Sequence, residues 1–247
     1  MQNSKFENQV KGLKQFSFLG FSFELLAAII IIAISILSSC GKESLELPSP
    51  SYNYFPTDLG RYVIYDVDSI VHSTDDNDND DSVYYFHYQV KEVIDTPFID
   101  GEGKERQVVV RYYRPDSTQA WSFNIVWSQT LSSTAAYRWE DNVPYHKMGF
   151  PISNEIQWNG NDKNTMNEEM YHYTDIHSSK SLNIFDFDST ITVIQRDDNN
   201  FVELIYGKEI YAAGIGMIFK ERDDLRKSGG MLVSGTEFKM TVNSFGN

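Results

Sequence analysis

Residues 121–128 read WSFNIVWS, the most regular alternation of apolar and polar side chains in this chain. Trp121, Phe123, Ile125 and Trp127 fall at every second position, separated mainly by serine and asparagine. Successive side chains of a β-strand point to opposite faces of a sheet, so this period of two indicates a half-buried strand. The stretch predicts a β-sheet whose buried face includes both tryptophans.

Similar strand patterns continue on both sides of this stretch. Between them lie short segments rich in Gly, Asn and Asp, which favour tight turns. Many short strands joined by such turns, without a long 3.6-residue period, predict an all-β domain: an antiparallel curved sheet, a half-barrel or a sandwich. One short helix is expected near residues 222–227. The other expected strands are residues 61–71, 83–94, 107–114, 168–176, 190–196, 201–211, 216–221 and 231–242.

The composition is strongly acidic. The chain has 247 residues and a formal net charge of −14. Nucleic acids are bound mainly through Lys and Arg, so this charge disfavours them as partners. It also disfavours adsorption to anionic lipid headgroups. The chain contains 16 Phe, 15 Tyr and 4 Trp, which supply the apolar surface that a folded core requires.

The N-terminal region has the layout of a secretory signal. Lys5, Lys11 and Lys14 precede the apolar run LLAAIIIIAISIL at residues 25–37, which is followed by small residues. A transmembrane helix is the alternative, but it needs roughly 20 apolar residues, and a glutamate interrupts the sequence before this run. The pattern therefore favours a signal peptide that begins with a helix and ends at residue 39.

Cys40 is the only cysteine of the chain, and residues 37–40, LSSC, resemble the lipobox of bacterial lipoproteins. That resemblance implies cleavage before Cys40 and acylation of its thiol, for example with palmitate. The lipid bilayer is then the expected partner, and stable anchoring takes at least two acyl chains. The expected location is the cell envelope, at the periplasmic or the external face of the outer membrane.

The remaining sequence divides into two parts. Residues 40–53 are polar, contain prolines and serines, and show no periodicity, so they predict a flexible tether. Residues 54–247 carry all the strand patterns and predict a single β-rich domain.

The densest acidic run is DDNDNDD at residues 75–81. Three alternate aspartates match the first ligand positions of a calcium-binding EF-hand loop. The match then fails, because Asp81 stands where that loop needs glycine and His87 stands where it needs glutamate. A solvated hairpin tip is favoured, with weak calcium binding as the alternative.

No pattern marks a catalytic residue, a metal site or a cofactor. The five histidines form no metal-binding motif, and His172 and His177 would point to opposite faces of a strand. The nucleophile motif G-x-S-x-G is absent, and the sequences at 228–229 and 234–235, both SG, are expected in turns. Trp139 and Trp158 lie beside turn residues and are the better candidates for an exposed surface on which sugars stack.

Five segments within residues 54–245 carry a further pattern: FPTDLGRY at 55–62, YDVDSI at 65–70, WNGN at 158–161, DSTITV at 188–193 and EIYAAGIGMIFKE at 209–221. Together they resemble a family of uncharacterised Bacteroidetes lipoproteins with a β-rich, curved sheet. The resemblance implies no activity. In the last segment, Gly214 and Gly216 predict a tight turn or bulge, where a missing Cβ permits positive φ.

Two functional hypotheses follow. The first is a non-enzymatic envelope lipoprotein that binds an apolar ligand, a glycan or an envelope protein. The second is a hydrolase that acts on envelope or extracellular glycans. An apolar concavity without convergent charges would favour the first, and a pocket with two facing carboxylates would favour the second.

Overall fold

The structure is a computed structural model that describes residues 51–74 and 81–247. These residues belong to a compact unit, Pro48–Asn247. The expected signal peptide, Cys40, most of the expected tether and the acidic residues 75–80 lie outside the described residues. Within the two described ranges, no helix has the length and apolarity that crossing a membrane requires.

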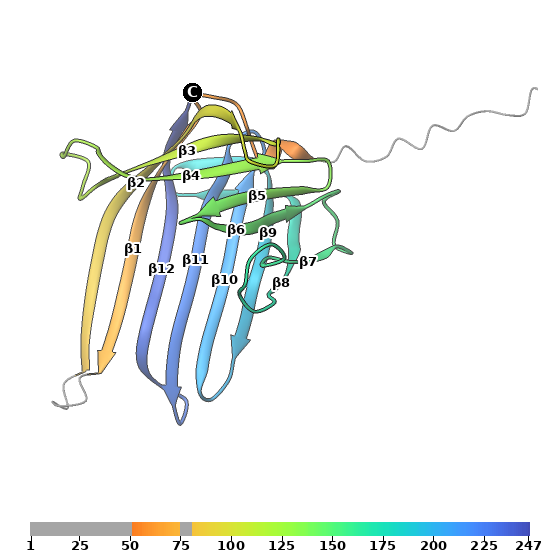
Figure 1. Cartoon of the computed structure of the whole chain (residues 1–247). Helices are drawn as coiled ribbons and strands as arrows, with labels where there is room; N and C mark the ends of the chain where they lie inside the picture. The colour runs from red at the N-terminus through yellow and green to blue at the C-terminus, as the bar shows by residue number, and fades with distance from the viewer. Residues whose placement is uncertain (1–50, 75–80) are drawn as a thin grey trace, which may run out of the picture. The chain divides into compact units, whose positions relative to one another are not determined.

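The prediction of an all-β, antiparallel curved sheet is confirmed. The described residues form a single antiparallel sheet of twelve strands after a short 3-10 helix, η1 (Tyr52–Tyr54) (Figure 1). The strands are β1 (Tyr62–Thr74), β2 (Asp81–Ile99), β3 (Glu105–Arg114), β4 (Ser122–Leu131), β5 (Ala135–Glu140), β6 (Val143–Gly149), β7 (Gln157–Asn159), β8 (Met170–Leu182), β9 (Phe185–Asn199), β10 (Glu203–Ala212), β11 (Gly216–Ser228) and β12 (Met231–Gly246).

The sheet is nearly closed on itself. Its strand order is β6-β5-β4-β3-β2-β1-β12-β11-β10-β9-β8-β7, so only the β1–β12 pair joins strands that are far apart in the chain. The two end strands, β6 and β7, also meet: the backbone N–H of His146 donates to the carbonyl of Gly160 at 2.9 Å. The indole N–H of Trp158 donates to the carbonyl of His146 at 2.8 Å. The result is a barrel-like sheet whose end strands are not left open to solvent.

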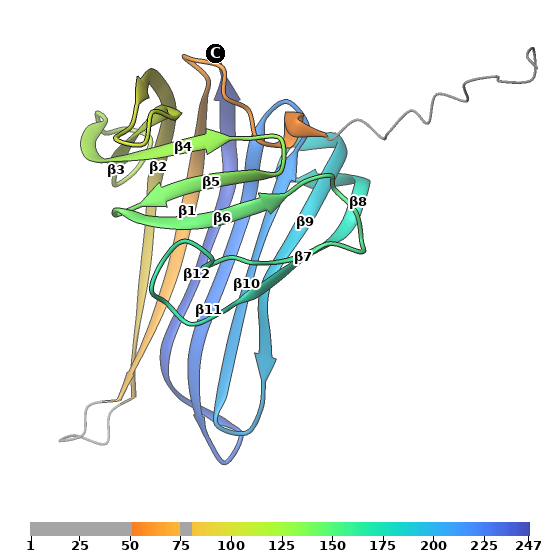
Figure 2. The same cartoon turned by 45° about the vertical axis from the view of Figure 1, so that its right-hand side comes forward.

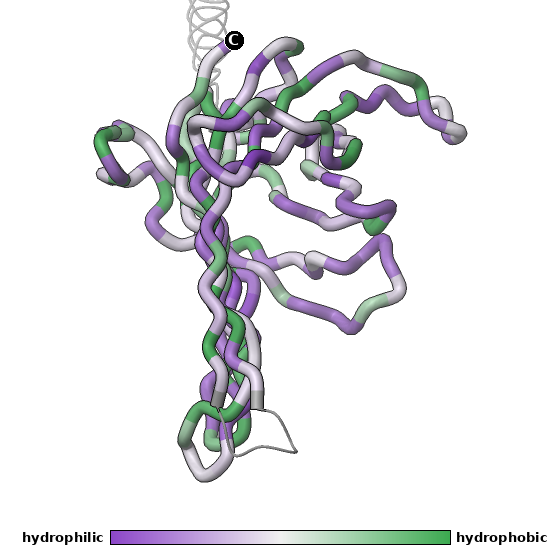
Figure 3. The backbone as a smooth tube through the Cα atoms, turned by 90° about the vertical axis from the view of Figure 1, so that its left-hand side faces the viewer, coloured by the Kyte–Doolittle hydropathy of each residue, from purple (hydrophilic) through white to green (hydrophobic). Residues whose placement is uncertain are grey.

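The long strands continue beyond the part of the sheet that β3–β6 cover. Figures 1 and 2 show β3–β6 lying across the upper part of the long strands, whose lower part carries no second layer. Figure 3 shows this lower part edge-on as one narrow layer. We call it the extension, and its inner face is the face that continues the core. It consists of residues 69–74, 81–88, 195–199, 203–206, 222–228 and 231–238.

The core fills the space between the two layers above the extension. Val67, Ile191, Val193, Ile218 and Val242 are all fully buried there. They come from four long strands of the sheet, β1, β9, β11 and β12, and Ile191 and Val193 occupy alternate positions of β9, as one buried sheet face requires. The core cluster includes Tyr54 of η1, and Tyr52 packs against it.

Two predictions about strands and turns are wrong. The helix expected near residues 222–227 does not form, because this segment belongs to β11 and pairs with β10 and β12 along its length. Ser234-Gly235 lies inside β12 rather than in a turn, and Gly235 faces His72 of β1 and Leu225 of β11. Tertiary pairing decides both segments, whose local signals are weak.

The expected burial of the tryptophans is also partly wrong. Residues 122–131 do form β4, but Phe123 is 64% exposed and Trp121 and Trp127 are only half-buried. The reason is that β4 pairs with β5 only from Ser128 onwards, so its first half lies at a margin of the sheet. Trp158, expected at an exposed turn, is 7% exposed and packs against Tyr173, with 4.7 Å between ring centroids.

Candidate functional site

The interior contains a cluster of four charged side chains that joins the two layers. Glu140 and Lys147 come from β5 and β6, whereas Glu209 and Lys220 come from β10 and β11. Lys147 Nζ lies 2.6 Å from Glu209 and 3.1 Å from Glu140, and Lys220 Nζ lies 3.3 Å from Glu209. The hydroxyl of Tyr211 also donates to Glu209, at 2.5 Å. Every charge in this cluster has an opposite charge beside it.

The pKa values favour the charged forms of Glu140, Glu209 and Lys147. Burial alone would raise the pKa of Glu140, but the charges of Lys147 and Lys220 outweigh it and lower the pKa to about 2. The same balance lowers the pKa of Glu209 further. Burial favours the neutral form of Lys147, but the two glutamates raise its pKa. A general acid–base pair needs a group that titrates near neutral pH, so this cluster is structural rather than catalytic.

A second buried ionic group lies beside it. Glu92 forms an ion pair with Arg111 at 3.0 Å and accepts a hydrogen bond from Arg138 at 2.9 Å, and Arg138 also donates to Gln129 at 2.8 Å. The cavity next to Glu92 and Arg138 has a volume of about 30 Å³. That volume suits one or two water molecules and excludes a ligand of useful size.

The histidines serve the structure. His146 lies between Asp162, 3.2 Å from Nδ1, and the carbonyl of Met148, 2.9 Å from Nε2, and burial lowers its pKa. His87 contacts Asp68 at 2.8 Å, and that contact raises the pKa of His87. His177 contacts the hydroxyl of Tyr54 at 2.7 Å. Among the residues that the structure describes, no three His, Asp or Glu side chains are arranged to hold a metal ion.

One carboxyl of the described part has a raised pKa. Asp223 lies on the outer face of the extension, directly opposite Glu237 in the β11–β12 pair. Burial is the main cause of its raised pKa, and the negative charges of Glu221 and Glu237 add to it. Glu237 in turn contacts His72 at 2.7 Å. A glycosidase also uses two neighbouring carboxyl groups, so this pair is a candidate for such a role.

Gly214 lies in the connection between β10 and β11, and Gly216 is the first residue of β11; their φ values are 75° and 101°. The N–H of Gly214 donates to the carbonyl of Asn53 at 2.8 Å, and Gly216 approaches Pro56 so closely that a Cβ would lie 3.3 Å from the proline ring. The connection therefore has the positive φ values that a tight turn needs. Its contacts with Asn53 and Pro56 hold the segment that precedes β1. Its role is structural.

The candidate binding site is a hollow of about 430 Å³ on the inner face of the extension. The pairing Arg222↔Phe238 and Asp224↔Thr236 places these side chains together across β11 and β12. Gly207 faces Arg222 from β10 and contributes no side chain. The residues that line the hollow are Arg222, Asp224, Arg226, Gly235, Thr236 and Phe238.

The charged side chains of this hollow are unpaired. Arg222, Asp224 and Arg226 are exposed, and none of them has an ion pair or side-chain hydrogen bond with any residue of the described ranges. Two lysines at neighbouring positions do have ion-pair partners. Lys220 contacts Glu209 at 3.3 Å, and Lys239 contacts Glu221 at 3.2 Å. The two arginines are therefore available to a ligand, with Asp224 between them and Glu203 opposite Arg226 in the β10–β11 pair.

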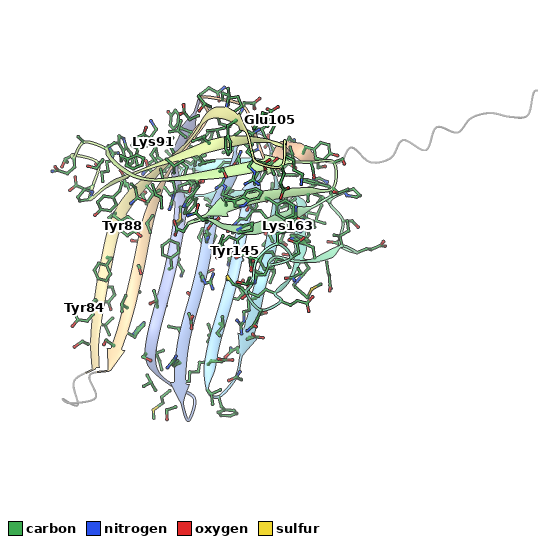
Figure 4. All side chains as sticks on the ribbon, viewed as in Figure 1. Tyr84, Tyr88, Lys91, Glu105, Tyr145 and Lys163 are labelled. Carbon is green, nitrogen blue, oxygen red and sulfur yellow. The ribbon has the colours of Figure 1, made fainter. Side chains whose placement is uncertain are left out.

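Aromatic side chains extend the same face. Tyr84 and Phe86 of β2 lie opposite Val71 and Ser69 of β1, on the face that carries Phe238, and both are more than half exposed. Figure 4 shows Tyr84 and Tyr88 projecting along β2. Tyr88 packs beside Tyr113 of β3, with 5.4 Å between ring centroids. The inner face thus combines ring surfaces with guanidinium groups.

Sequence reasoning missed this site because it expected a helix over the residues that build it. The signal that could have found it is the alternation Arg222, Asp224, Arg226, which places three charges on one strand face. Of the tryptophan candidates, Trp158 is buried and the guanidinium of Arg106 lies 3.6 Å from the ring centroid of Trp139. Trp139 and Trp127 line a separate hollow of about 330 Å³.

Comparison with known proteins finds no family model, no curated protein and no solved structure that matches the chain.

Proposed function

We propose that this chain is an outer-membrane-anchored lipoprotein whose β domain is a non-enzymatic binding module. The inner face of the extension binds a ligand that joins an anionic group to an apolar or ring surface, such as an acidic glycan. Acyl chains on Cys40 hold the domain at the membrane, as the resemblance of residues 37–40 to a lipobox implies.

This proposal rests on the two arginines that line the hollow, neither of which has an ion-pair partner among the described residues. Guanidinium groups bind carboxylates and phosphates through two parallel hydrogen bonds. A protein with a formal net charge of −14 repels anions in general, so an anionic ligand needs direct contact with unpaired guanidinium groups such as those of Arg222 and Arg226. The volume of about 430 Å³ lies within the range of small-ligand sites.

The proposal that the domain is not an enzyme rests on the charged state of its buried carboxylates. The buried carboxylates Glu140 and Glu209 are held in their charged form by lysines, and the cavity near Glu92 is the size of water molecules. Neither arrangement offers a proton donor next to space for a substrate.

Titration calorimetry of the full chain in detergent tests the proposal. We expect an oligosaccharide of galacturonic acid to bind, and the neutral galactose oligosaccharide to bind at least tenfold more weakly. Arg222→Gln/Arg226→Gln should lose most of the acidic ligand's affinity, whereas Lys104→Gln, which removes one exposed cation elsewhere, should not. Equal binding by the double variant and the wild type would overturn the assignment of this surface.

A glycan-directed hydrolase is the second candidate, favoured by one observation: the raised pKa of Asp223 opposite Glu237. A raised pKa suits a general acid. If this pair were catalytic, the purified chain would release reducing sugars from a glycan, and Asp223→Asn and Glu237→Gln would each abolish the release. We expect no release from the wild type, because Glu237 is occupied by His72 and the hollow lies on the opposite face.

A further inference from the structure

The lower half of β2 is an open strand edge. β2 pairs with β1 over Asp81–Val93, but it pairs with β3 only from Gln89 onwards. Residues 81–88 therefore have a strand on one side and, within the described part of the chain, no strand on the other. Figures 1 and 2 show this half of β2 at the free margin of the extension.

The exposed edge lacks the features that normally protect one. Residues 82–88 read SVYYFHY, with no Lys, Asp, Glu or Pro. The side chain of Tyr85 is 75% exposed, and those of Val83, Tyr84 and Phe86 are exposed as well. The register between β1 and β2 has no shift over this length, so no bulge turns the edge away. Natural proteins avoid such flat, apolar edges because they pair with other chains.

The opposite margin of the extension is protected. β9 loses its pairing with β8 beyond Ile194, and the residues that follow are Gln195, Arg196, Asp197 and Asp198. Arg196 contacts Asp198 at 2.6 Å and Glu169 at 3.6 Å, so charges cover this edge. The margin of β4 is also covered in part, because guanidinium groups lie over Trp121 and Trp127.

We infer that a second copy of this chain pairs with the open edge of β2 in antiparallel fashion, about a two-fold axis at Tyr85. This register places Tyr85 opposite its own copy, Tyr84 opposite Phe86, and Val83 opposite His87. Aromatic cross-strand pairs are favourable, and the segment brings no like charges together. A partner of different sequence is not required, because residues 82–88 are complementary to themselves.

The symmetry limits the assembly to a dimer. A two-fold interface uses the same edge of both copies and so closes on itself. The charged edge of β9 cannot continue the pairing into a fibre. Two extensions joined in this way form one continuous sheet, and their inner faces lie on the same side.

The association is expected to be weak. The exposed parts of Val83, Tyr84, Tyr85 and Phe86 offer roughly 400 Å² per copy, if a buried aromatic side chain contributes about 200 Å². A standard stable interface needs about 800 Å² per partner. The dimer should therefore form at high local concentration and dissociate on dilution.

Cysteine cross-linking of the full chain tests this inference independently of any ligand. In a Cys40→Ser background, Tyr85→Cys provides the only thiol, and in the dimer it lies opposite its own copy. A short bismaleimide should then cross-link Tyr85→Cys into dimers at least tenfold faster than Ile184→Cys, whose side chain is 89% exposed at a hairpin end. Equal rates for the two variants would overturn the inference.

A mixing experiment tests the register. Val83→Cys and His87→Cys should each cross-link slowly alone and rapidly when mixed, because residue 83 faces residue 87 of the other copy. Tyr85→Lys should weaken self-association in sedimentation equilibrium at least tenfold while leaving the circular dichroism spectrum unchanged. Fast cross-linking of either single variant alone, or undiminished association of Tyr85→Lys, would contradict the proposed pairing.

Discussion

Gly235 is the residue whose backbone most directly shapes the candidate site. It has φ of +132°, and a Cβ added there would lie 2.1 Å from the carbonyl oxygen of Asp224 on the neighbouring strand. The position thus allows β11 and β12 to approach where the hollow is lined. A side chain of any size must push the two strands apart, because the contact is with backbone.

Gly235→Ala should lower the free energy of unfolding by at least about 2 kcal/mol, since the strained φ alone costs about 1–2 kcal/mol. Urea denaturation followed by circular dichroism measures this. Gly101→Ala is the matched control, because its φ is not positive and nothing lies within 4 Å of its added Cβ. A Gly235→Ala variant as stable as the control would show that the strands do not approach at this point.

Lys147 is the second residue with a testable role, because it neutralises two buried glutamates. Lys147→Met leaves Glu140 and Glu209 with Lys220 as their only cation in the cluster. Breaking a buried ion pair in this way costs about 3–5 kcal/mol. Lys104→Met removes an exposed pair with Glu102 and should leave the stability nearly unchanged, because exposed ion pairs contribute little. Comparable urea midpoints for the two variants would contradict the structural role of the cluster.

The same glutamates determine how stability depends on pH. Their pKa values are lowered in the folded state, to about 2 for Glu140, so the unfolded chain binds more protons than the folded chain at acidic pH. Their contribution to stability is therefore complete above the unfolded value, about 4.3, and is lost as the pH falls towards 2. Urea denaturation at pH 7, 4 and 3 should show this loss, and Glu209→Gln should show a smaller one. A wild-type stability that does not fall between pH 4.5 and 3 would be inconsistent with the lowered values.

At the scale of elements, most strands could be predicted from the sequence, but the strands that pair beside them, and therefore their burial, could not. The alternation in residues 121–128 correctly indicates β4, yet its apolar face is half exposed because β5 begins to pair only at Ser128. β5 and β6 were not expected, since residues 135–149 show no clear alternation and contain Pro144. Proline is tolerated there because β6 is an end strand of the hydrogen-bonded order.

The candidate site was the least predictable part. Arg222, Asp224 and Arg226 form a site only because β12 and β10 place Phe238 and the bare backbone of Gly207 beside them. Those neighbours depend on pairing between distant segments, which no local pattern contains. The edge of β2 is similar: the sequence indicates the strand, but only the end of β3 at Arg114 leaves one edge of residues 81–88 without a strand beside it in the described ranges.

The extension should be the least protected part of the sheet. Its strands have no second layer above them, whereas the upper halves of the same strands cover the core. Hydrogen exchange tests this within a single strand: backbone amides of residues 232–238 of β12 should exchange faster than those of residues 240–245. The physical reason is that local opening of the extension exposes little buried apolar surface. Equal protection along β12 would indicate that something covers the extension.

At the scale of the whole molecule, we propose that a lipid anchor holds the folded β domain at the membrane. Cys40→Ser should abolish incorporation of labelled fatty acid and shift the protein from the membrane fraction to the soluble fraction or to an unprocessed precursor. The reason is that Cys40 is the only thiol of the chain. Equal label in the wild type and the variant would exclude the lipobox.

The central claim is that the hollow beside Arg222 and Arg226 binds an anionic ligand. Nuclear magnetic resonance of the arginine side-chain Nε–Hε groups tests it most directly, during titration with an oligosaccharide of galacturonic acid. The account predicts saturable shifts at Arg222 and Arg226, and none at Arg106, which lies over Trp139 outside the hollow. Saturable shifts at other arginines, or no shift at Arg222 and Arg226 under saturating ligand, would contradict it.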